Sequence, residues 1–219
     1  MSTLVRDYLR PPHTVSRGTG ASTTGYGASD PDSQPTEAGC YEAADAAFDY
    51  VTNVLKVPPG DVVLFGRSLG SGPTVELARR QPKVAGVILQ SPLTSGIRTK
   101  CCGCVAWALC CCDVFPSIDK APHIEPIVLI MHGLVDNVVP CENGQTLYEA
   151  LPNTWTPLWV DGAGHNDMEH VAGPNMQRHM RGFLDKCAEI RRVRDNATVT
   201  TVSMSSADAG YQGEPLPLF

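Results

Sequence analysis

The sequence lacks a membrane-spanning segment, a secretory signal and the basic charge that is typical of nucleic-acid-binding proteins. No apolar run approaches the about 20 residues that a membrane-spanning helix needs, and residues 1–13 lack the apolar core of a secretory signal. With 17 Lys and Arg against 23 Asp and Glu, the formal net charge is −6. This acidic balance disfavours a nucleic-acid-binding surface. We therefore expect a cytoplasmic protein without a nucleic-acid partner.

The sequence has nine cysteines, but their arrangement disfavours both disulfides and a zinc site. Six of the nine fall in Cys101–Cys104 and Cys110–Cys112. Adjacent cysteines do not pair easily with one another, and no oxidising compartment is expected without a secretory signal. The spacing is not that of zinc ligands and no histidine is interleaved, so we predict no metal site.

Two interpretations of this Cys-rich, lid-like insert (97–120) are open, since the residues between the thiols, 105–109, are distinctly apolar. The cysteines are small buried hydrophobes, or they form a membrane-facing lid whose thiols are acylated or seat an acyl chain. A metal or redox role is a further alternative without a ligand spacing in its favour.

The 219 residues are enough for one globular domain, and the 42% hydrophobic and 18% charged content is ordinary for one. Residues 1–35 are rich in Gly, Ser, Thr and Pro and are predicted to be irregular or disordered. Residues 36–192 carry the periodic patterns of a domain. Residues 193–219 are polar and then Pro-rich, and are predicted to be a disordered tail.

Continuous apolar runs alternate with helix-compatible stretches inside this domain. The predicted strands are 61–65, 84–89, 127–131 and 157–160. The predicted helices are one that begins near Thr36 and ends before Pro58, then 71–80, 144–150 and 175–190. Strands that are apolar on both faces and alternate with helices are typical of a parallel sheet covered on both sides. The predicted fold class is therefore α/β.

A Gly-x-Ser-x-Gly pentapeptide, 66–70, joins the first predicted strand to the second predicted helix. In this position the pattern predicts a nucleophile elbow, a sharp turn that holds the serine in a strained backbone conformation. Glycines two residues before and after it avoid steric clashes. The turn places the serine hydroxyl clear of the sheet at the start of a helix, so Ser68 is the candidate nucleophile.

A serine hydroxyl needs a histidine base, and the histidine needs a carboxylate that fixes its tautomer and stabilises the imidazolium. In this type of fold the order along the chain is Ser, acid, His, each after a strand. Asp136 follows strand 127–131 and His165 follows strand 157–160. Although an aspartate in a loop is most often a turn or cap residue, the order of the three residues predicts that Asp136 is the acid and His165 the base.

The other titratable residues near these loops are placed less well. The other histidines considered end a strand, lie in a proline-rich connector, or lie on or near the last helix (His132, His123, His170 and His179). Asp161 could supply the carboxylate, but it shares a loop with His165. Asp167 and Glu169 are expected to start the final helix or to line the mouth of the site.

A hydrolase of this type also needs two donors for the oxyanion. The backbone N–H of Leu69, the residue after the nucleophile, is the expected first donor. The second donor usually comes from an early His-Gly-x segment. The only His-Gly of this sequence is His132-Gly133, which belongs to the loop that carries Asp136, the predicted acid. The second donor segment is therefore predicted to be missing.

Four blocks of the sequence together resemble the alpha/beta-hydrolase-domain protein depalmitoylases, which are relatives of the Bem46-like and prolyl-oligopeptidase-like serine hydrolases (peptidase clan SC). The blocks are 24–29, 66–74, 91–96 and 162–167, and the resemblance runs from about Thr24 to Leu184. It implies the alpha/beta-hydrolase fold with a mostly parallel sheet, the roles of Ser68, Asp136 and His165, and no cofactor. It also implies a palmitoylated protein cysteine as the thioester substrate.

The sequence departs from this family in two places. Family members carry several strands and a His-Gly-Asn oxyanion segment before the Gly-Tyr-Gly of the first block, where this chain has residues 1–23. They also carry a cysteine cluster near the N-terminus, whereas here the cysteines lie in the lid region. We therefore expect an N-terminally truncated domain whose early strands are missing, with strand 62–65 left as an unpaired edge.

The preferred interpretation is a serine hydrolase that acts on an acylated protein or a small ester, with peripheral membrane contact through the Cys-rich insert. One alternative is a serine peptidase of the prolyl-oligopeptidase-like group, because related sequences are often classed as peptidases. The other is a catalytically inactive, truncated form that acts as an interaction protein, which the missing oxyanion segment motivates.

Overall fold

The computed structural model describes residues 3–7, 18–21, 36–96 and 113–208. The cysteines of 101–112 and the block 24–29 lie outside the described residues, so the two interpretations of the Cys-rich insert stay predictions. Among the helices that are described, none combines the length and hydropathy that crossing a bilayer requires.

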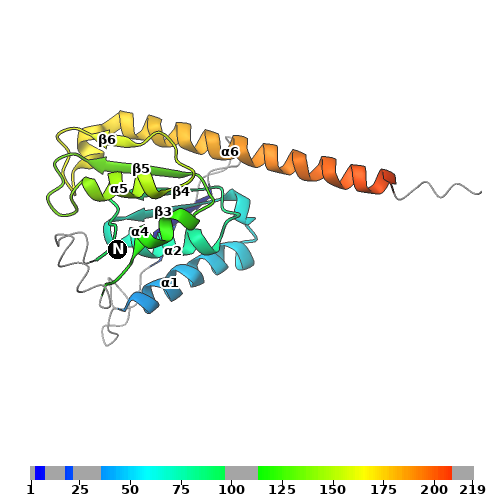
Figure 1. Cartoon of the computed structure of the whole chain (residues 1–219), viewed down its shortest axis with the longest axis horizontal. Helices are drawn as coiled ribbons and strands as arrows, with labels where there is room; N and C mark the ends of the chain where they lie inside the picture. Colours follow the sequence, from blue (N-terminus) through cyan, green and yellow to red (C-terminus); the bar gives the residue numbers. More distant parts are fainter. Residues whose placement is uncertain (1–2, 8–17, 22–35, 97–112, 209–219) are drawn as a thin grey trace, which may run out of the picture.

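The described residues build one sheet of six strands in the order β2-β1-β3-β4-β5-β6 (Figure 1). The strands are β1 Thr3–Asp7, β2 Gly18–Ala21, β3 Val62–Arg67, β4 Gly86–Gln90, β5 Val128–Gly133 and β6 Leu158–Val160. The four strands β3 to β6 are mutually parallel. The predicted strands of the domain all occur within two residues of their expected bounds, since buried parallel strands leave a continuous apolar signal.

From the sequence, strand β3 is expected to be an unpaired edge of the sheet, but strand β1 pairs with it. It pairs with β3 in antiparallel register, from Leu4 opposite Phe65 to Asp7 opposite Val62, and with β2 on its other side. The prediction that β3 is unpaired is therefore wrong, and part of the segment predicted to be irregular (1–35) is strand. A five-residue strand next to a Gly-rich four-residue strand has too short a pattern to stand out from a loop.

The helices of the described residues cover both faces of the sheet (Figure 1). They are α1 Glu37–Asp49, which continues into η1 Tyr50–Val54, α2 Ser71–Arg80, α4 Ser117–Lys120, α5 Glu142–Ala150 and α6 Met168–Asp208, with short 3-10 turns η2 Pro59–Asp61, η3 Ser68–Gly70 and η5 Ala121–His123. The Thr36 hydroxyl accepts a hydrogen bond from the Gly39 N–H at 3.0 Å and so caps α1.

The core divides into two layers that follow the alternation of side chains along each strand. On β4, Val87 and Leu89 belong to the layer with α1, α2 and α5. Between them, Ile88 points to the opposite face and packs in the layer of α6, together with Phe183. Both faces of the sheet are therefore buried, as the apolar runs predict.

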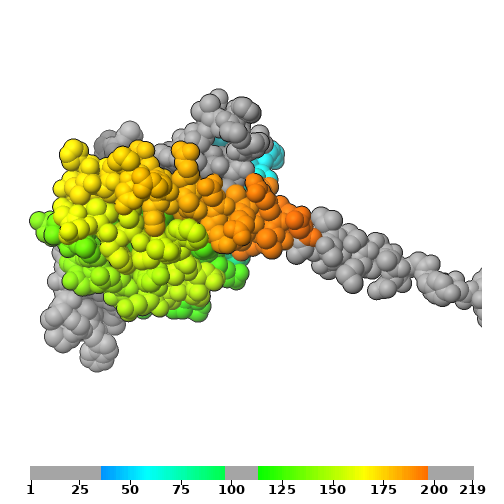
Figure 2. All heavy atoms as spheres, turned by 90° about the horizontal axis from the view of Figure 1, so that it is seen from above, coloured from blue at the N-terminus to red at the C-terminus, as the bar shows by residue number. Residues whose placement is uncertain are grey.

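Helix α6 lies across one face of the sheet and extends beyond the body of the molecule (Figures 1 and 2). The helix is broken near its start at Gly173, which has a φ of 46°. The next residue is Pro174, which cannot donate a backbone hydrogen bond. The helix then continues past residue 192 to Asp208, so the first part of the predicted disordered tail is helical. No Pro follows before residue 208, and no Gly apart from Gly182, so the sequence carries no helix-stop signal there.

Candidate active site

The turn between β3 and α2 has the geometry of a nucleophile elbow. Ser68 has a φ of 51°, a backbone conformation that is rare for a residue with a side chain. A Cβ atom added at Gly66 would lie 2.4 Å from Thr74 Oγ1 and 2.7 Å from the Gly70 carbonyl oxygen. The turn therefore closes on itself so tightly that position 66 accepts only glycine.

Hydrogen bonds from side chains fix this turn to its surroundings. The Ser71 hydroxyl donates to the Ser68 carbonyl at 2.7 Å and accepts from the Leu93 N–H at 3.2 Å. The Thr74 hydroxyl donates to the Gly70 carbonyl at 2.8 Å. The nucleophile is thereby tied both to its own helix and to the segment that follows β4.

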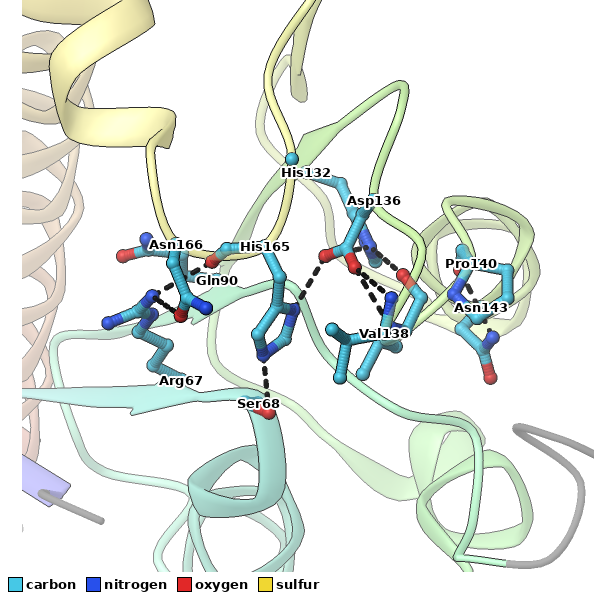
Figure 3. A network of polar contacts seen from close by, with 12 residues as sticks. Arg67, Ser68, Gln90, His132, Asp136, Val138, Pro140, Asn143, His165 and Asn166 are labelled. Atoms are coloured by element: carbon cyan, nitrogen blue, oxygen red, sulfur yellow. Dashed lines mark hydrogen bonds and ion pairs between the residues drawn. The ribbon is translucent and has the colours of Figure 1, made fainter.

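The structure brings the three predicted residues of the triad together at the carboxyl ends of three strands (Figure 3). His165 Nε2 lies 2.9 Å from Ser68 Oγ, and His165 Nδ1 lies 2.7 Å from Asp136 Oδ2. A carboxylate accepts a hydrogen bond, so Nδ1 carries the proton and Nε2 is left to accept one from the serine. This is the arrangement that a general base requires.

Asp136 is held in its ionised form by the turn that surrounds it. Its second oxygen, Oδ1, accepts backbone hydrogen bonds from Val138 and Val139, both at 2.9 Å. Burial alone would raise the pKa of this carboxyl. The hydrogen bonds from His165 and from the two backbone N–H groups outweigh burial, so the pKa of Asp136 lies below its usual value.

A second histidine contacts the loop that carries Asp136. His132, the fifth residue of β5, is fully buried, and its Nε2 lies 2.9 Å from the Val139 carbonyl oxygen. Because a carbonyl only accepts, Nε2 carries the proton. Burial is the main cause that lowers the pKa of His132, so the ring is neutral at pH 7. His132, which directly follows a predicted strand and is not one of the predicted triad residues, is thus bonded locally.

Asn143 is a buried residue of the site that the sequence reasoning missed. Its Oδ1 accepts from the Thr94 hydroxyl at 2.7 Å and from the Thr94 N–H at 3.2 Å, and its Nδ2 donates to the Pro140 carbonyl at 3.1 Å. It therefore joins the segment after β4 to the loop of the acid. The available signal was weak, namely an amide in the first turn of a helix that directly follows this loop.

The remaining candidates lie outside the triad. Asp167 accepts a hydrogen bond from the Gly164 N–H at 2.7 Å, and its carbonyl accepts from the N–H groups of His170 and Val171. It thus organises the start of α6, as expected. His179 bonds the Thr156 carbonyl at 2.7 Å. Among the described residues, no cluster of three His, Cys, Asp or Glu side chains is arranged to hold a metal ion.

The predicted oxyanion donor, Leu69, lies in η3 between Ser68 and the start of α2. Backbone N–H groups at the start of a helix lack intrahelical partners, so this is a suitable place for a donor. The early segments in which a second donor would be sought, 8–17 and 22–35, lie outside the described residues. The missing second donor therefore stays a prediction.

The fold and the site geometry invite comparison with known proteins. No family model matches the chain. Among solved structures, it resembles the alpha/beta hydrolase GrgF from Penicillium sp. sh18, with a TM-score of 0.60, 15% identity and 81% of each chain covered. It also resembles a monoacylglycerol lipase from Paleococcus ferrophilus, with a TM-score of 0.51 and 20% identity over 68% of this chain and 75% of that one. These likenesses define the fold as that of the alpha/beta hydrolases.

Curated relatives narrow this class to a family. The chain is 37% identical over 186 residues to the alpha/beta hydrolase domain-containing protein aho-3 of Caenorhabditis elegans, covering 84% of this chain and 53% of the relative. It is 42% identical over 153 residues to the human alpha/beta hydrolase domain-containing protein 17C, covering 68% of this chain and 44% of the relative. The chain is therefore a homologue of the alpha/beta hydrolase domain-containing proteins, and it spans about half the length of these relatives.

Proposed function

We propose that this chain is a serine hydrolase that transfers acyl groups to water and that its preferred substrates are thioesters or esters. The observation that carries the proposal is the continuous hydrogen-bond chain from Ser68 Oγ through His165 to Asp136. Each of the three side chains sits where the reaction needs it, and no cofactor is required for acyl transfer by such a triad.

In the first half of the reaction, Ser68 Oγ attacks the acyl carbonyl carbon while His165 Nε2 takes the hydroxyl proton. Asp136 stabilises the imidazolium that results, and the Leu69 N–H donates to the oxyanion. Collapse of the tetrahedral intermediate breaks the bond to the leaving thiol or alcohol, which receives the proton from His165. Water then attacks the acyl-enzyme by the same route and releases the acid.

The substrate class we propose is a long-chain acyl thioester, such as a palmitoylated cysteine of a protein, or a small ester. The resemblance of the four sequence blocks to depalmitoylases supports this choice. The apolar residues on the loop of the acid support it further, because Leu134, Val135 and Val138 are 44%, 58% and 42% exposed beside Asp136. An exposed apolar rim favours an acyl chain, and it suits a cytoplasmic protein that meets its substrate at a membrane surface.

The experiment that tests the function compares three substrates with the same protein and a Ser68→Ala control. The substrates are a palmitoyl thioester of a short cysteine peptide, the matched palmitoyl ester of a serine peptide, and an unacylated peptide amide. We expect turnover of the thioester that is lost in Ser68→Ala. Preference for the amide would identify a peptidase instead. Equal turnover by Ser68→Ala would refute Ser68 as the nucleophile, and no turnover of any of the three substrates would favour an inactive form that acts as an interaction protein.

A further inference from the structure

The residue directly before the nucleophile extends to the loop of the base. Arg67 ends β3, and its Nη2 atom donates to the main-chain carbonyl of His165 at 2.8 Å and to Asn166 Oδ1 at 3.0 Å (Figure 3). These contacts join positions almost a hundred residues apart in the sequence. They tie the strand of the nucleophile to the loop of the base.

Two consecutive residues of β3 and η3 thus hold the same histidine at its two ends. Ser68 Oγ lies 2.9 Å from the ring nitrogen Nε2 of His165, and Arg67 holds its carbonyl oxygen. Because the main chain of His165 is fixed from β3, the ring keeps its reach to the serine. A displacement of the loop would change the distance between Nε2 and Oγ.

The start of α6, which directly follows this loop, is held in a similar way from the neighbouring strand. Arg67 and Gln90 are register partners at the ends of β3 and β4. Gln90, which is almost fully buried, donates to Glu169 Oε1 at 2.8 Å at the start of α6. The last residues of two adjacent strands therefore hold the loop 161–167 and the start of α6 that follows it, and Arg67 supplies the contact that reaches His165 itself.

We propose that Arg67 is a positioning residue, which sets the distance between Ser68 and His165 by holding the main chain of the base. The inference rests on the proposed function, because it assigns a role in the same site. Arg67 contacts none of the reacting atoms. A guanidinium suits this role since it has five N–H donors in a fixed plane, whereas a lysine ammonium is a point charge on a flexible stem.

The test uses Arg67→Met, which keeps an apolar stem, and Arg67→Lys, which keeps the charge. Arg79→Met is the matched control, because it removes an arginine that bonds Glu76 on α2. Misplacement of a catalytic group by about 1 Å can cost about 10²-fold in rate. We expect Arg67→Met to lower kcat by about 10- to 10²-fold with KM nearly unchanged, Arg67→Lys to recover part of the loss, and Arg79→Met to resemble the wild type.

Hydrogen exchange of the peptide that spans 161–170 provides a readout that is independent of turnover. We expect faster exchange in Arg67→Met, confined to this peptide, with a denaturation midpoint close to that of Arg79→Met. Unchanged exchange in this peptide would overturn the proposal, as would a loss expressed in KM with kcat unchanged. If the wild type shows no Ser68-dependent turnover, the proposed function fails, and the exchange measurement still decides whether Arg67 holds the loop.

Discussion

Replacement of the acid by its amide, Asp136→Asn, tests the triad with the smallest change of shape. Asp136 Oδ1 accepts two backbone N–H groups at 2.9 Å, and an asparagine oxygen can keep both bonds. Its NH₂ group then faces His165 Nδ1 at the 2.7 Å position of Oδ2. Because an NH₂ group only donates, Nδ1 must give up its proton and Nε2 must carry one.

A histidine with its proton on Nε2 cannot accept the proton of Ser68. In a Ser-His-Asp triad this wrong tautomer costs about 10⁴-fold in kcat, which corresponds to about 5.4 kcal/mol of activation free energy. We expect a loss of this size in thioester turnover, while the fold is retained because both backbone bonds to position 136 remain.

The assay measures kcat and KM of the wild type and Asp136→Asn at pH 7.5, with the denaturation midpoint as a check of folding. Asp161→Asn is the matched control, since Asp161 is an exposed carboxylate on the loop that carries His165. It should stay close to the wild type. Retention of more than about a tenth of the activity by Asp136→Asn would refute the assignment of the acid.

Three further predictions concern the framework of the site. Gly66→Ala should destabilise the protein by about 1–3 kcal/mol in urea denaturation and remove activity, because its Cβ would lie 2.4 Å from Thr74 Oγ1; Gly182→Ala, with no atom within 4 Å of its Cβ, is the control that should fold normally. Burial lowers the pKa of folded His132, so its contribution to stability is complete above the unfolded pKa of about 6.5 and is lost as pH falls below it. His132→Gln should flatten the fall in urea midpoint between about pH 6.5 and 5, and an unchanged slope would contradict this. Phe183→Ala should cost about 3–5 kcal/mol, and a loss below about 1 kcal/mol would contradict the packing of α6 on the sheet.

The parts of the fold that were predictable are those with a local signal. The apolar runs of β3, β4 and β5 appear in the sequence because both faces of these strands are buried, and α2 has the predicted bounds Ser71–Arg80. Strand β1 could not be predicted in the same way. Its five residues gain their stability from pairing with β3, more than 50 positions away, and no local pattern records such a partner.

The site, like the fold, has parts that could be predicted from the sequence and parts that could not. The elbow and the order of Ser68, Asp136 and His165 could be predicted, because each follows a recognisable strand and the reaction dictates their types. The contacts of Arg67 and Asn143 could not, since they depend on how loops from different strands approach one another. An arginine inside the pentapeptide gives no sign, in sequence alone, of the carbonyl that it will bind.

Covalent labelling with a fluorophosphonate probe measures whether His165 and Asp136 activate Ser68 as a nucleophile. Mass spectrometry of the digested protein locates the adduct. We expect one adduct on the peptide that contains Ser68 in the wild type, and none in Ser68→Ala. Absence of labelling in the wild type, or equal labelling of Ser68→Ala, would contradict this activation.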